Sequence, residues 1–468
     1  MVVAKATKAS NALISIAKNT WGIGYKAAKH IYLGAIEPIL LYAAPIWADA
    51  TQKVYIQKKL SKAQRVAALR ICRAYRTAPT SALLVIAGLI PVHIKARMMA
   101  RNWKFNNLFL NNNPLDNIRN NNTLLELPND LKNDILTFGI ELKDPTSNTM
   151  YDYPSASNNI STYNETNDIS IFTDGSKDDN KVGAAFVLYD HQTGKTHRSA
   201  FKLGPHCSVP QAEILAITKA IDHVFAEWFP HSKSITIYSD SITAIYSITN
   251  QGKRGDNVLH IHQLLSNNSH GHNIQFKWVR GHSGVVGNEA ADRLAKSAAV
   301  STLPSSYSKI PLSKIKHWSY QIALHQWQEE WNNSDTGRLT FDFIPDIARR
   351  LEWKHFTPKF VMTQLLTGHG NFRAYLKRFN LRNEDTCDCD NNSIQNSKHY
   401  LFDCSLFDDK RNNLLDSVLY EGFNWPCPLN VFIENKVIYS RLNDFLSATE
   451  ALNPPRNLPN TKDEHATT

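Results

Sequence analysis

Apolar and polar positions follow two different rhythms along this chain, and the changes between them divide it into regions. From residue 10 to about 107, apolar residues recur at helical spacing with basic residues between them, most clearly in 54–75. This pattern predicts helices with one basic face. Residues 111–168 lose the periodicity and are rich in Asn, Asp, Ser, Thr and Pro. We expect a linker there, with one short ordered stretch at 124–142.

Strand-like alternation begins at residue 169. The runs lie at 169–173, 183–189, 196–203, 234–239 and 273–279, and helical patterns separate the later ones. Three strands close together, followed by strands that alternate with helices, predict an α/β fold whose mixed sheet is antiparallel at first and parallel later. After about residue 300 the pattern becomes helical again, and a Cys/His cluster follows near the C-terminus.

These changes of pattern predict five regions. They are a basic helical segment (1–110), an Asn-rich linker (111–168), an α/β domain (169–299), a helical region with a Cys/His cluster (300–450) and a disordered polar tail (451–468). The length of 468 residues exceeds what one hydrophobic core usually holds, so several domains are expected.

Positive charge is concentrated in the first of these regions. The chain carries a net charge of +10, and residues 1–110 hold 17 Lys and Arg against two acids. Any phosphate-binding surface is therefore expected in this segment. The candidates for nucleic-acid contact are Lys58, Lys59, Lys62 and Arg65 on the predicted basic helix. A solubilising face without a ligand is the alternative.

The cysteine content and the N-terminal sequence bear on the compartment. Six cysteines are too few and too clustered for a disulfide framework, and no secretory signal pattern is recognisable, so an intracellular, reducing setting is expected. The most apolar N-terminal stretch, 31–47, is interrupted by Glu37, Pro38 and Pro45. It is too short for a membrane span, and neither a transmembrane helix nor a membrane partner is expected.

Acidic residues stand where an α/β sheet binds ligands. Asp174 follows the first strand, although an Asp-Gly pair read alone more often marks a turn. Glu213 shares a predicted helix face with apolar residues, so its burial would demand a cation, unless it is only a helix-boundary acid. Asp240 ends another strand, where it is either a ligand or a helix N-cap. Asp292 lies one turn into a later helix.

Four carboxylates in one place repel each other unless divalent cations neutralise them. Oxygen ligands without thiolates favour two Mg²⁺ ions, or Mn²⁺ in their place. In two-metal phosphodiester hydrolysis one ion activates water and the other stabilises the leaving oxygen. His282, in a Gly-flanked loop before Asp292, would then be a mobile proton carrier. Read alone, a loop histidine is usually only solvated.

Five sequence blocks in this order resemble the type 1 ribonuclease H family. They read Ile-Phe-Thr-Asp-Gly-Ser, Gln-Ala-Glu-Ile-Leu-Ala, Ile-Tyr-Ser-Asp-Ser, Trp-Val-Arg-Gly-His-Ser-Gly and Gly-Asn-Glu-Ala-Ala-Asp-Arg-Leu-Ala. The resemblance implies a five-stranded mixed sheet, a Mg²⁺ centre at Asp174, Glu213, Asp240 and Asp292, assistance from His282, and RNA–DNA hybrids as substrate.

The chain departs from that family at two places. The Gly-Asn-Pro-Gly sequence of many bacterial members is replaced by Lys177-Asp-Asp-Asn, which puts the substrate contacts of that loop in doubt. No basic helical protrusion is recognisable between Asp240 and His282. Hybrid affinity is therefore expected to depend on neighbouring domains.

The flanking regions resemble parts of non-LTR retrotransposon polyproteins of the Jockey and I-factor-like groups. Residues 34–47 and the basic helix 57–75 are similar to the thumb-side end of their reverse transcriptases. No Tyr- or Phe-x-Asp-Asp motif in a strand–turn–strand setting is found. The chain is thus expected to be a truncated element without a polymerase palm or an endonuclease.

A Cys/His cluster near the C-terminus predicts a zinc knuckle. Cys387, Cys389, His399 and Cys404 offer four ligands suited to tetrahedral zinc, although core thiols are the alternative. The preceding residues 365–379 resemble the C-terminal region of the same polyproteins, which favours zinc. Their basic and aromatic side chains either contact nucleic acid or pack as an amphipathic helix.

The resulting hypothesis is an endoribonuclease that cuts the RNA strand of RNA–DNA hybrids. One alternative is a catalytically silent retroelement remnant that binds nucleic acid, which the intact set of four acids disfavours. Another is DNA strand transfer or exonucleolysis on a similar sheet, which the position of Glu213 in the first helix disfavours. Access to chromosomal DNA suggests the nucleus as the compartment.

Overall fold

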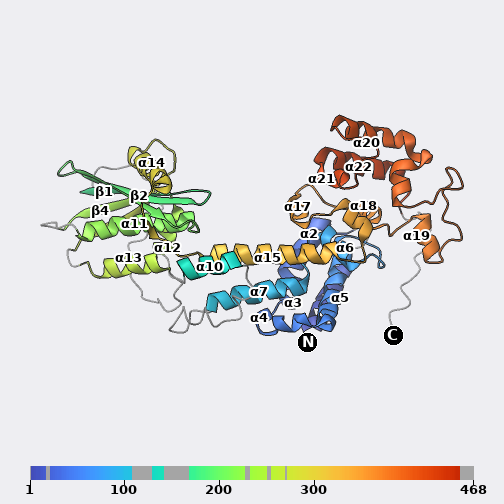
Figure 1. The fold of residues 1–468 in the computed structure, drawn as a ribbon, viewed down its shortest axis with the longest axis horizontal. Helices are drawn as coiled ribbons and strands as arrows, with labels where there is room; N and C mark the ends of the chain where they lie inside the picture. Colours follow the sequence, from blue (N-terminus) through green and yellow to red (C-terminus); the bar gives the residue numbers. More distant parts are fainter. Residues whose placement is uncertain are drawn as a thin grey trace. The chain divides into compact units, whose positions relative to one another are not determined.

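The computed structural model describes residues 2–16, 22–107, 129–141, 168–226, 232–249, 255–268 and 271–453. The chain divides into two compact units, one formed by 1–103 with 319–468 and the other by 104–318 (Figure 1). We call them unit 1 and unit 2. Most of the expected linker, part of the expected stretch 124–142, and the tail beyond residue 453 lie outside the described residues.

Unit 2 is built around a six-stranded mixed sheet in the order β5-β4-β1-β2-β3-β6. The strands are β1 (Ile169–Asp178), β2 (Lys181–Asp190), β3 (Thr196–Leu203), β4 (Ser234–Ser239), β5 (Asn273–Trp278) and β6 (Ser305–Tyr307). β1, β2 and β3 form an antiparallel meander, while β4 pairs in parallel with β1, and β5 in parallel with β4. The predicted mixed sheet is confirmed, and β6 adds a short strand in parallel beside β3.

Helices cover both faces of this sheet. They are α11 (Val209–Ala226), α12 (Ile242–Thr249) and α14 (Val286–Val300). α13 (Asp256–Ser266) packs on α11 and α12, and unit 2 also contains α10 (Asn129–Phe138). Gly175 faces α11, because a Cβ there would lie 2.5 Å from the amide nitrogen of Glu213. Gly183, on the opposite face, meets the backbone of α14. The sheet is therefore enclosed between α11 and α14, as Figure 1 shows.

The start of α11 is fixed by a capping box. The Ser208 amide donates to Gln211 Oε1 at 2.8 Å, and the Gln211 amide donates to Ser208 Oγ at 3.4 Å. The backbone amides of Ser208 and Gln211 thereby each have a side-chain acceptor. The first turn, which precedes Glu213 directly, is held in one position.

Unit 1 is helical. Its N-terminal helices are α1 (Val2–Ile16), α2 (Tyr25–Ile31), α3 (Glu37–Leu40), α4 (Ala44–Trp47), α5 (Val54–Ile71), α6 (Thr80–Ala87) and α7 (Val92–Asn107). The later helices are α15 (Leu312–Asn332), α16 (Arg338–Phe343), α17 (Ile347–Glu352), α18 (Phe360–Thr367), α19 (Arg373–Arg378), α20 (Asp408–Tyr420), α21 (Val431–Glu434) and α22 (Lys436–Thr449). Helical regions before and after the sheet are thus confirmed.

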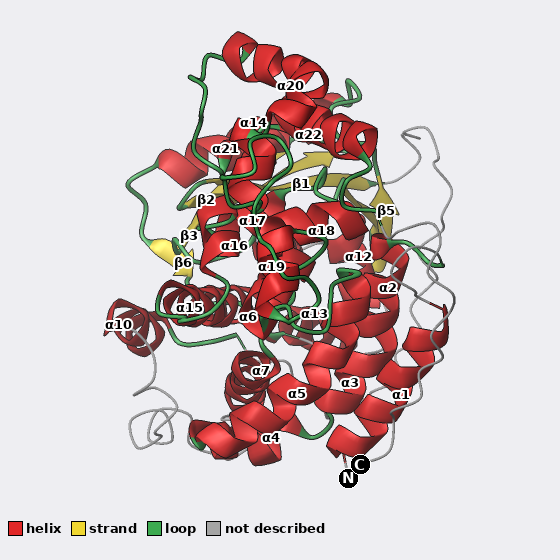
Figure 2. Cartoon of the chain, turned by 90° about the vertical axis from the view of Figure 1, so that its right-hand side faces the viewer, coloured by secondary structure: helices red, strands yellow, loops and turns green. Residues whose placement is uncertain are grey.

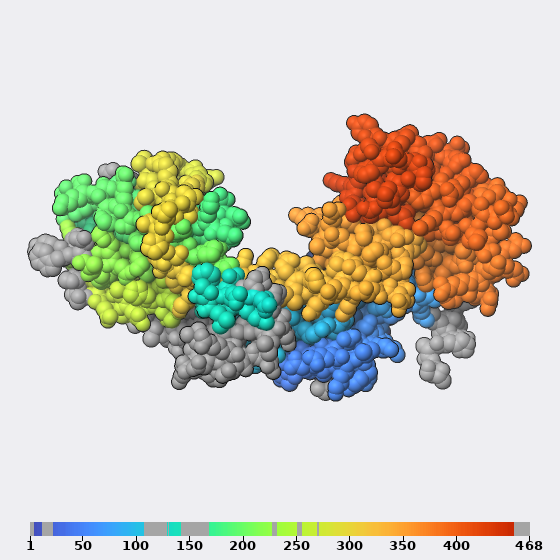
Figure 3. Space-filling view, in the orientation of Figure 1, coloured from blue at the N-terminus to red at the C-terminus, as the bar shows by residue number. Residues whose placement is uncertain are grey.

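The two helical segments of unit 1 share one hydrophobic core. Buried side chains from both, such as Ile71 and Leu84 on one side and Trp331 and Phe343 on the other, form a single cluster. In the cartoon and in the space-filling view the two segments adjoin (Figures 2 and 3). Two segments that are far apart in the sequence therefore fold as one body.

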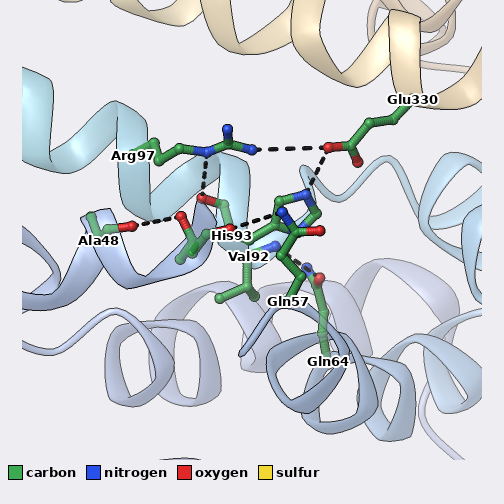
Figure 4. A network of polar contacts seen from close by, with 8 residues as sticks. Ala48, Gln57, Gln64, Val92, His93, Arg97 and Glu330 are labelled. Atoms are coloured by element: carbon green, nitrogen blue, oxygen red, sulfur yellow. Dashed lines mark hydrogen bonds and ion pairs between the residues drawn. The ribbon is translucent and has the colours of Figure 1, made fainter. Parts of the chain in front are cut away.

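Polar contacts add to this packing (Figure 4). His93 Nε2 on α7 lies 2.8 Å from Glu330 Oε1 on α15, and Arg97 reaches the same oxygen at 3.9 Å. Gln64 is fully buried, and its Oε1 accepts from the Val92 amide at 3.0 Å. The network links α5, the start of α7 and the last turn of α15.

Among the described residues, no single helix is long and apolar enough to cross a membrane. Two bent helix pairs meet the length and hydropathy requirement only when taken together, Tyr25–Leu40 with Ala44–Gln52 and Thr80–Ala87 with Val92–Asn106.

Candidate active site

Asp174 lies inside β1, directly after residue 173, where the sequence predicted the strand to end. β1 continues to Asp178 because it pairs with β2, whereas its parallel pairing with β4 ends at Thr173 and Ser239. The expectation that the strand ends before Asp174 was therefore wrong. The residue instead occupies the position where β1 extends past the end of β4, and its side chain is 6% exposed.

Gly175 brings the first helix close to this strand. A Cβ at this position would lie 2.5 Å from the Glu213 nitrogen and 2.9 Å from the Ala212 carbonyl carbon. Only glycine leaves room for that approach. In the sequence, the Asp-Gly pair indicates only a turn, and nothing in the sequence indicates this role of Gly175.

This contact yields a first prediction, for Gly175→Ala. The added methyl group must push α11 away from β1, because the atoms it meets are backbone atoms. We expect a loss of about 2 to 4 kcal/mol in unfolding free energy and a marked loss of divalent-metal affinity. Denaturant unfolding and metal titration measure the two effects. Gly34→Ala is the matched control, since a Cβ there meets nothing within 4 Å in the described structure. Equal behaviour of the two variants would contradict the prediction.

Glu213 is the buried carboxylate that its helical spacing predicted. It is 4% exposed and lies on α11 among the buried Ile217, Ala220 and Val224. The Gly175 amide and the Ser239 side chain hydrogen-bond the carboxylate. Its Oε2 atom is buried and has no hydrogen-bond partner among the described residues. A buried carboxylate oxygen without a hydrogen-bond partner is a suitable ligand for a cation.

Asp240 follows β4 directly and is held by its neighbours. The Trp278 indole donates to its carbonyl at 2.9 Å, and Asn288 Nδ2 donates to its Oδ2 at 3.4 Å. The N-cap role falls to Ser241, whose Oγ accepts from the Ala244 amide at 3.3 Å. The carboxylate of Asp240 is thus not used as a helix cap and is available to a ligand.

Three of the four predicted acids come together. Ligand oxygens of Asp174, Glu213 and Asp240 all lie within 4.8 Å of one another. Burial, followed by the charges of Asp240 and Asp292, raises the pKa of Asp174 to about 7. Burial, followed by Asp174 and Asp240, raises the pKa of Glu213 to about 9. Without a cation, the cluster therefore retains protons near neutral pH.

These raised values predict how stability depends on pH. Both carboxyls bind protons more tightly in the folded chain than at their ordinary values of 3.8 and 4.5. The metal-free protein should therefore lose stability as the pH rises from about 4 to about 9. Mg²⁺ competes with these protons, so its stabilising effect should grow over the same range. The test is the thermal midpoint with and without Mg²⁺ at pH 6, 7, 8 and 9. A Mg²⁺ effect that is largest at pH 6 would contradict this prediction.

Asp292 lies outside the group of three. It is on α14, and its Oδ2 accepts from Lys296 Nζ at 2.8 Å, an i,i+4 ion pair. It is near enough to Asp174 to raise the pKa of that residue, while Lys296 lowers it. Lys296 was not predicted, although an acid followed four residues later by lysine is a recognisable helical pair.

His282 is exposed on the turn that follows β5. It adopts a positive φ of 53°, and Gly284 two residues later has a φ of 82°. The turn passes close to the cluster, because a Cβ on Gly281 would lie 2.8 Å from Asp240 Oδ2. The role of His282 as a proton carrier stays a prediction.

The Cys/His cluster is a second candidate site, and its four predicted ligands come together. Cys387 Sγ lies 3.5 Å from Cys404 Sγ, and Cys389 Sγ lies 3.4 Å from His399 Nε2. All four ligand atoms are within 4.8 Å of one another. Sulfur atoms bound to one tetrahedral zinc at about 2.3 Å lie about 3.8 Å apart, so the geometry fits. Burial raises the pKa of Cys404 to about 12.

Several side chains of residues 365–379, the segment before the Cys/His cluster, pack against the rest of unit 1. Phe372 and Tyr375 are buried in the core of unit 1. Arg373 donates to the Thr386 carbonyl at 2.8 Å and pairs with Asp388, while Lys377 pairs with an acid of the same loop. Of the two readings offered for residues 365–379, these contacts favour the packed helix.

The predicted basic residues of α5 differ from one another. Lys58, Lys59 and Lys62 are exposed. Arg65 is partly buried, and its Nη1 donates to the Ala78 carbonyl at 2.7 Å and to Thr80 Oγ1 at 2.8 Å. The guanidinium of Arg65 is already hydrogen-bonded within unit 1. The three lysines are therefore the better candidates for binding a phosphate group.

Comparison with known proteins assigns the sheet-containing part of the chain. The RNase H family model matches residues 166–300. A Pol polyprotein from the type-1 retrotransposable element R1 of Bradysia coprophila is 34% identical over 102 residues, 21% of this chain and 10% of that protein. Ribonuclease H1 of Rattus norvegicus is 37% identical over 101 residues, 19% of this chain and 34% of that protein.

A solved structure, that of LC11-RNase H1 in complex with an RNA/DNA hybrid, aligns with 28% of this chain and 96% of its own. The sequence identity is 20% and the TM-score is 0.24. The matched part of the chain thus spans about a tenth of the R1 polyprotein and about a third of ribonuclease H1. The similarity to R1-type retrotransposon Pol polyproteins is distant.

Proposed function

Residues 166–300 form an RNase H domain, and we propose that it hydrolyses the RNA strand of RNA–DNA hybrids at the cluster of Asp174, Glu213 and Asp240. The observation that carries this proposal is the unsatisfied, buried Oε2 of Glu213 beside two further carboxylates within 4.8 Å. A purely structural cluster of acids would pair with lysine, arginine or backbone amides.

The donor set fits hard divalent cations. Carboxylate oxygens without a thiolate suit Mg²⁺, and Mn²⁺ in its place. Asp174, Glu213 and Asp240 would hold one ion, and Asp174 with Asp292 a second. When bound, such ions lower the pKa of water and stabilise the leaving 3′ oxygen. Asp292 reaches this role by exchanging its ion pair with Lys296 for a metal, and the long lysine side chain, which is largely exposed, can move away.

The remaining side chains orient and exchange protons. Asn288 and the Trp278 indole keep Asp240 in place, and the Gly175 amide does the same for Glu213. His282, on its exposed turn, would carry a proton between solvent and the reacting phosphate.

A substrate panel tests the proposal. Purified protein with Mg²⁺ is given an RNA–DNA hybrid, single-stranded RNA, duplex RNA and duplex DNA of one sequence. We expect cleavage of the hybrid, at least about a hundredfold faster than of any other substrate. Tight hybrid binding without cleavage in Mg²⁺ or Mn²⁺ would instead support a catalytically silent nucleic-acid-binding protein.

A second candidate function, nucleic-acid binding by unit 1, is favoured by the exposed face of α5. Tyr55 is 56% exposed, and the ammonium group of Lys59 lies 5.7 Å from the centre of its ring. Lys58 and Lys62 lie on the same face by helical spacing. Of the two acids in residues 1–110, Glu37 is buried against Lys95. An aromatic ring among exposed lysines suits a nucleic-acid strand.

The salt dependence of hybrid affinity tests this second function. Replacing Lys58, Lys59 and Lys62 with Ala should reduce the slope of log affinity against log salt by about 2 to 3. The control replaces three exposed lysines of unit 1 outside α5: Lys354, Lys410 and Lys436. Equal slopes for both triple variants would show that net charge alone, and not the α5 face, sets the affinity.

A further inference from the structure

Two segments outside the matched RNase H residues are built into unit 2. Residues 129–141 carry α10, and residues 305–311 carry β6; together we call them the brace. Ile140 and Ile310 form a parallel bridge, in which the Glu141 amide donates to the Ile310 carbonyl at 2.8 Å. Both views show α10 beside the first part of α15, whose residues 312–318 belong to unit 2 (Figures 1 and 2). The two halves of the brace therefore support each other.

The brace contacts the first turn of α11 through Gln211. Gln211 is 4% exposed, and its Nε2 donates to Glu141 Oε2 at 2.8 Å and to the Lys309 carbonyl at 3.1 Å. Its Oε1 is used by the capping box with Ser208. Both amide donors of Gln211 thus go to the brace, and its acceptor goes to the helix cap. Cys207 adds sulfur contacts to the Tyr307 and Lys309 carbonyls at 3.7 and 3.8 Å.

Glu213 follows Gln211 by two residues, which is about 3 Å along a helix axis. On its other side the helix backbone already touches Gly175. The first turn of α11 is therefore held between β1 and the brace. A shift of this turn would displace the Glu213 carboxylate from the ligand oxygens of Asp174 and Asp240.

We propose that Glu141 is a positioning residue, which acts through Gln211 to place Glu213 for divalent-metal binding. The proposal rests on the proposed function of the carboxylate cluster. Glu141 lies outside the residues that match the RNase H family model. Metal affinity at the carboxylate cluster should therefore depend on a carboxylate that itself binds no metal. Outer-shell groups of this kind change metal affinity without being ligands themselves.

The test compares full-length variants by two readouts: Mn²⁺ affinity from water-proton relaxation, and the Mg²⁺ midpoint of hybrid cleavage. Glu141→Ala should weaken Mn²⁺ binding about tenfold or more and raise the Mg²⁺ midpoint in parallel, with the cleavage rate recovering at saturating Mg²⁺. Glu141→Gln keeps an acceptor for Gln211 and should stay within about twofold of the original chain. Gln211→Ala removes this link together with the capping-box acceptor for Ser208. It should weaken Mn²⁺ binding at least as much as Glu141→Ala, and the double variant should be no worse than Gln211→Ala.

Asp134→Ala is the matched control within the brace. It removes a partly exposed ion pair with His206 at 3.2 Å that does not involve Gln211. This variant should lower the thermal midpoint slightly and leave Mn²⁺ affinity unchanged. Unchanged Mn²⁺ affinity in Glu141→Ala and Gln211→Ala, or an equal loss in Asp134→Ala, would overturn the proposal.

The two readouts also separate this inference from the proposed function. If the original chain cleaves no hybrid but Glu141→Ala still weakens Mn²⁺ binding, the enzymatic function fails and the positioning role stands. If the chain cleaves hybrid and both variants bind Mn²⁺ as tightly as the original chain does, only the positioning role fails. Should Glu141→Ala not fold, Gln211→Ala gives the same answer, because it breaks the link from the other end.

Discussion

Glu213→Gln and Asp174→Asn are expected to abolish hybrid cleavage while stabilising the metal-free protein. Burial and mutual repulsion raise the pKa of Asp174 to about 7 and of Glu213 to about 9, so each carboxylate destabilises the fold when no cation is bound. A neutral amide of the same shape removes that penalty, by about 1 to 3 kcal/mol at pH 8. It also removes a metal ligand, and cleavage should fall about a thousandfold or more.

Urea unfolding of Mg²⁺-free protein at pH 8 and single-turnover cleavage measure these two effects in the same samples. Asp335→Asn, an exposed acid in unit 1, is the control and should change neither. If the variants lost stability together with activity, the carboxylates would be structural groups, and the assignment of the site would be wrong.

We propose that the Cys/His cluster holds one zinc ion, and loss of this ion is expected to destabilise unit 1 and leave unit 2 intact. The cluster joins the loop after α19 to His399 and Cys404, which flank the buried Tyr400 and Leu401 of the unit 1 core. Without zinc, four ligand groups within 4.8 Å lose their common partner. We expect Cys387→Ser to lower the unfolding free energy of unit 1 by at least about 3 kcal/mol.

Metal analysis and calorimetry measure this effect. The original chain should contain one zinc ion, and Cys387→Ser should contain less and unfold earlier. Cys427→Ser changes a thiol that is buried in unit 1 outside the cluster, and it should retain the zinc. A chain that contains no zinc when purified from zinc-supplied cells would contradict the assignment.

The hydrophobic pattern predicted five strands of the sheet, but neither the full length of β1 nor the edge strand β6. Five strands lie close to their expected places. Of these, β1, β2 and β4 are runs of mostly buried residues, while β3 and β5 are mostly exposed or partly buried. β1 is longer than expected, since its pairing with β2 carries it through the Asp-Gly pair to a turn at Asp179, which has a positive φ of 54°. β6 was not predicted, because its three residues are exposed or partly buried and become a strand only by pairing with β3.

At the candidate site, too, the sequence predicted properties of single elements but not the contacts between elements. Glu213 could be predicted as buried because its spacing places it on the apolar face of one helix. The close approach at Gly175 and the hydrogen bonds of Arg65 to Ala78 and Thr80 could not, since they depend on how separate elements meet. The shared core of the two helical segments of unit 1 was missed for the same reason.

Identifying which strand of a hybrid is cut tests the proposed function most directly. An RNA–DNA hybrid with different dyes on its two strands is incubated with the full-length protein and Mg²⁺, and both strands are resolved over time. We predict internal cuts in the RNA that leave 3′ hydroxyl ends, an intact DNA strand, and no cutting by Glu213→Gln. Cutting of the DNA strand, or RNA cutting that persists in Glu213→Gln, would contradict the proposed function.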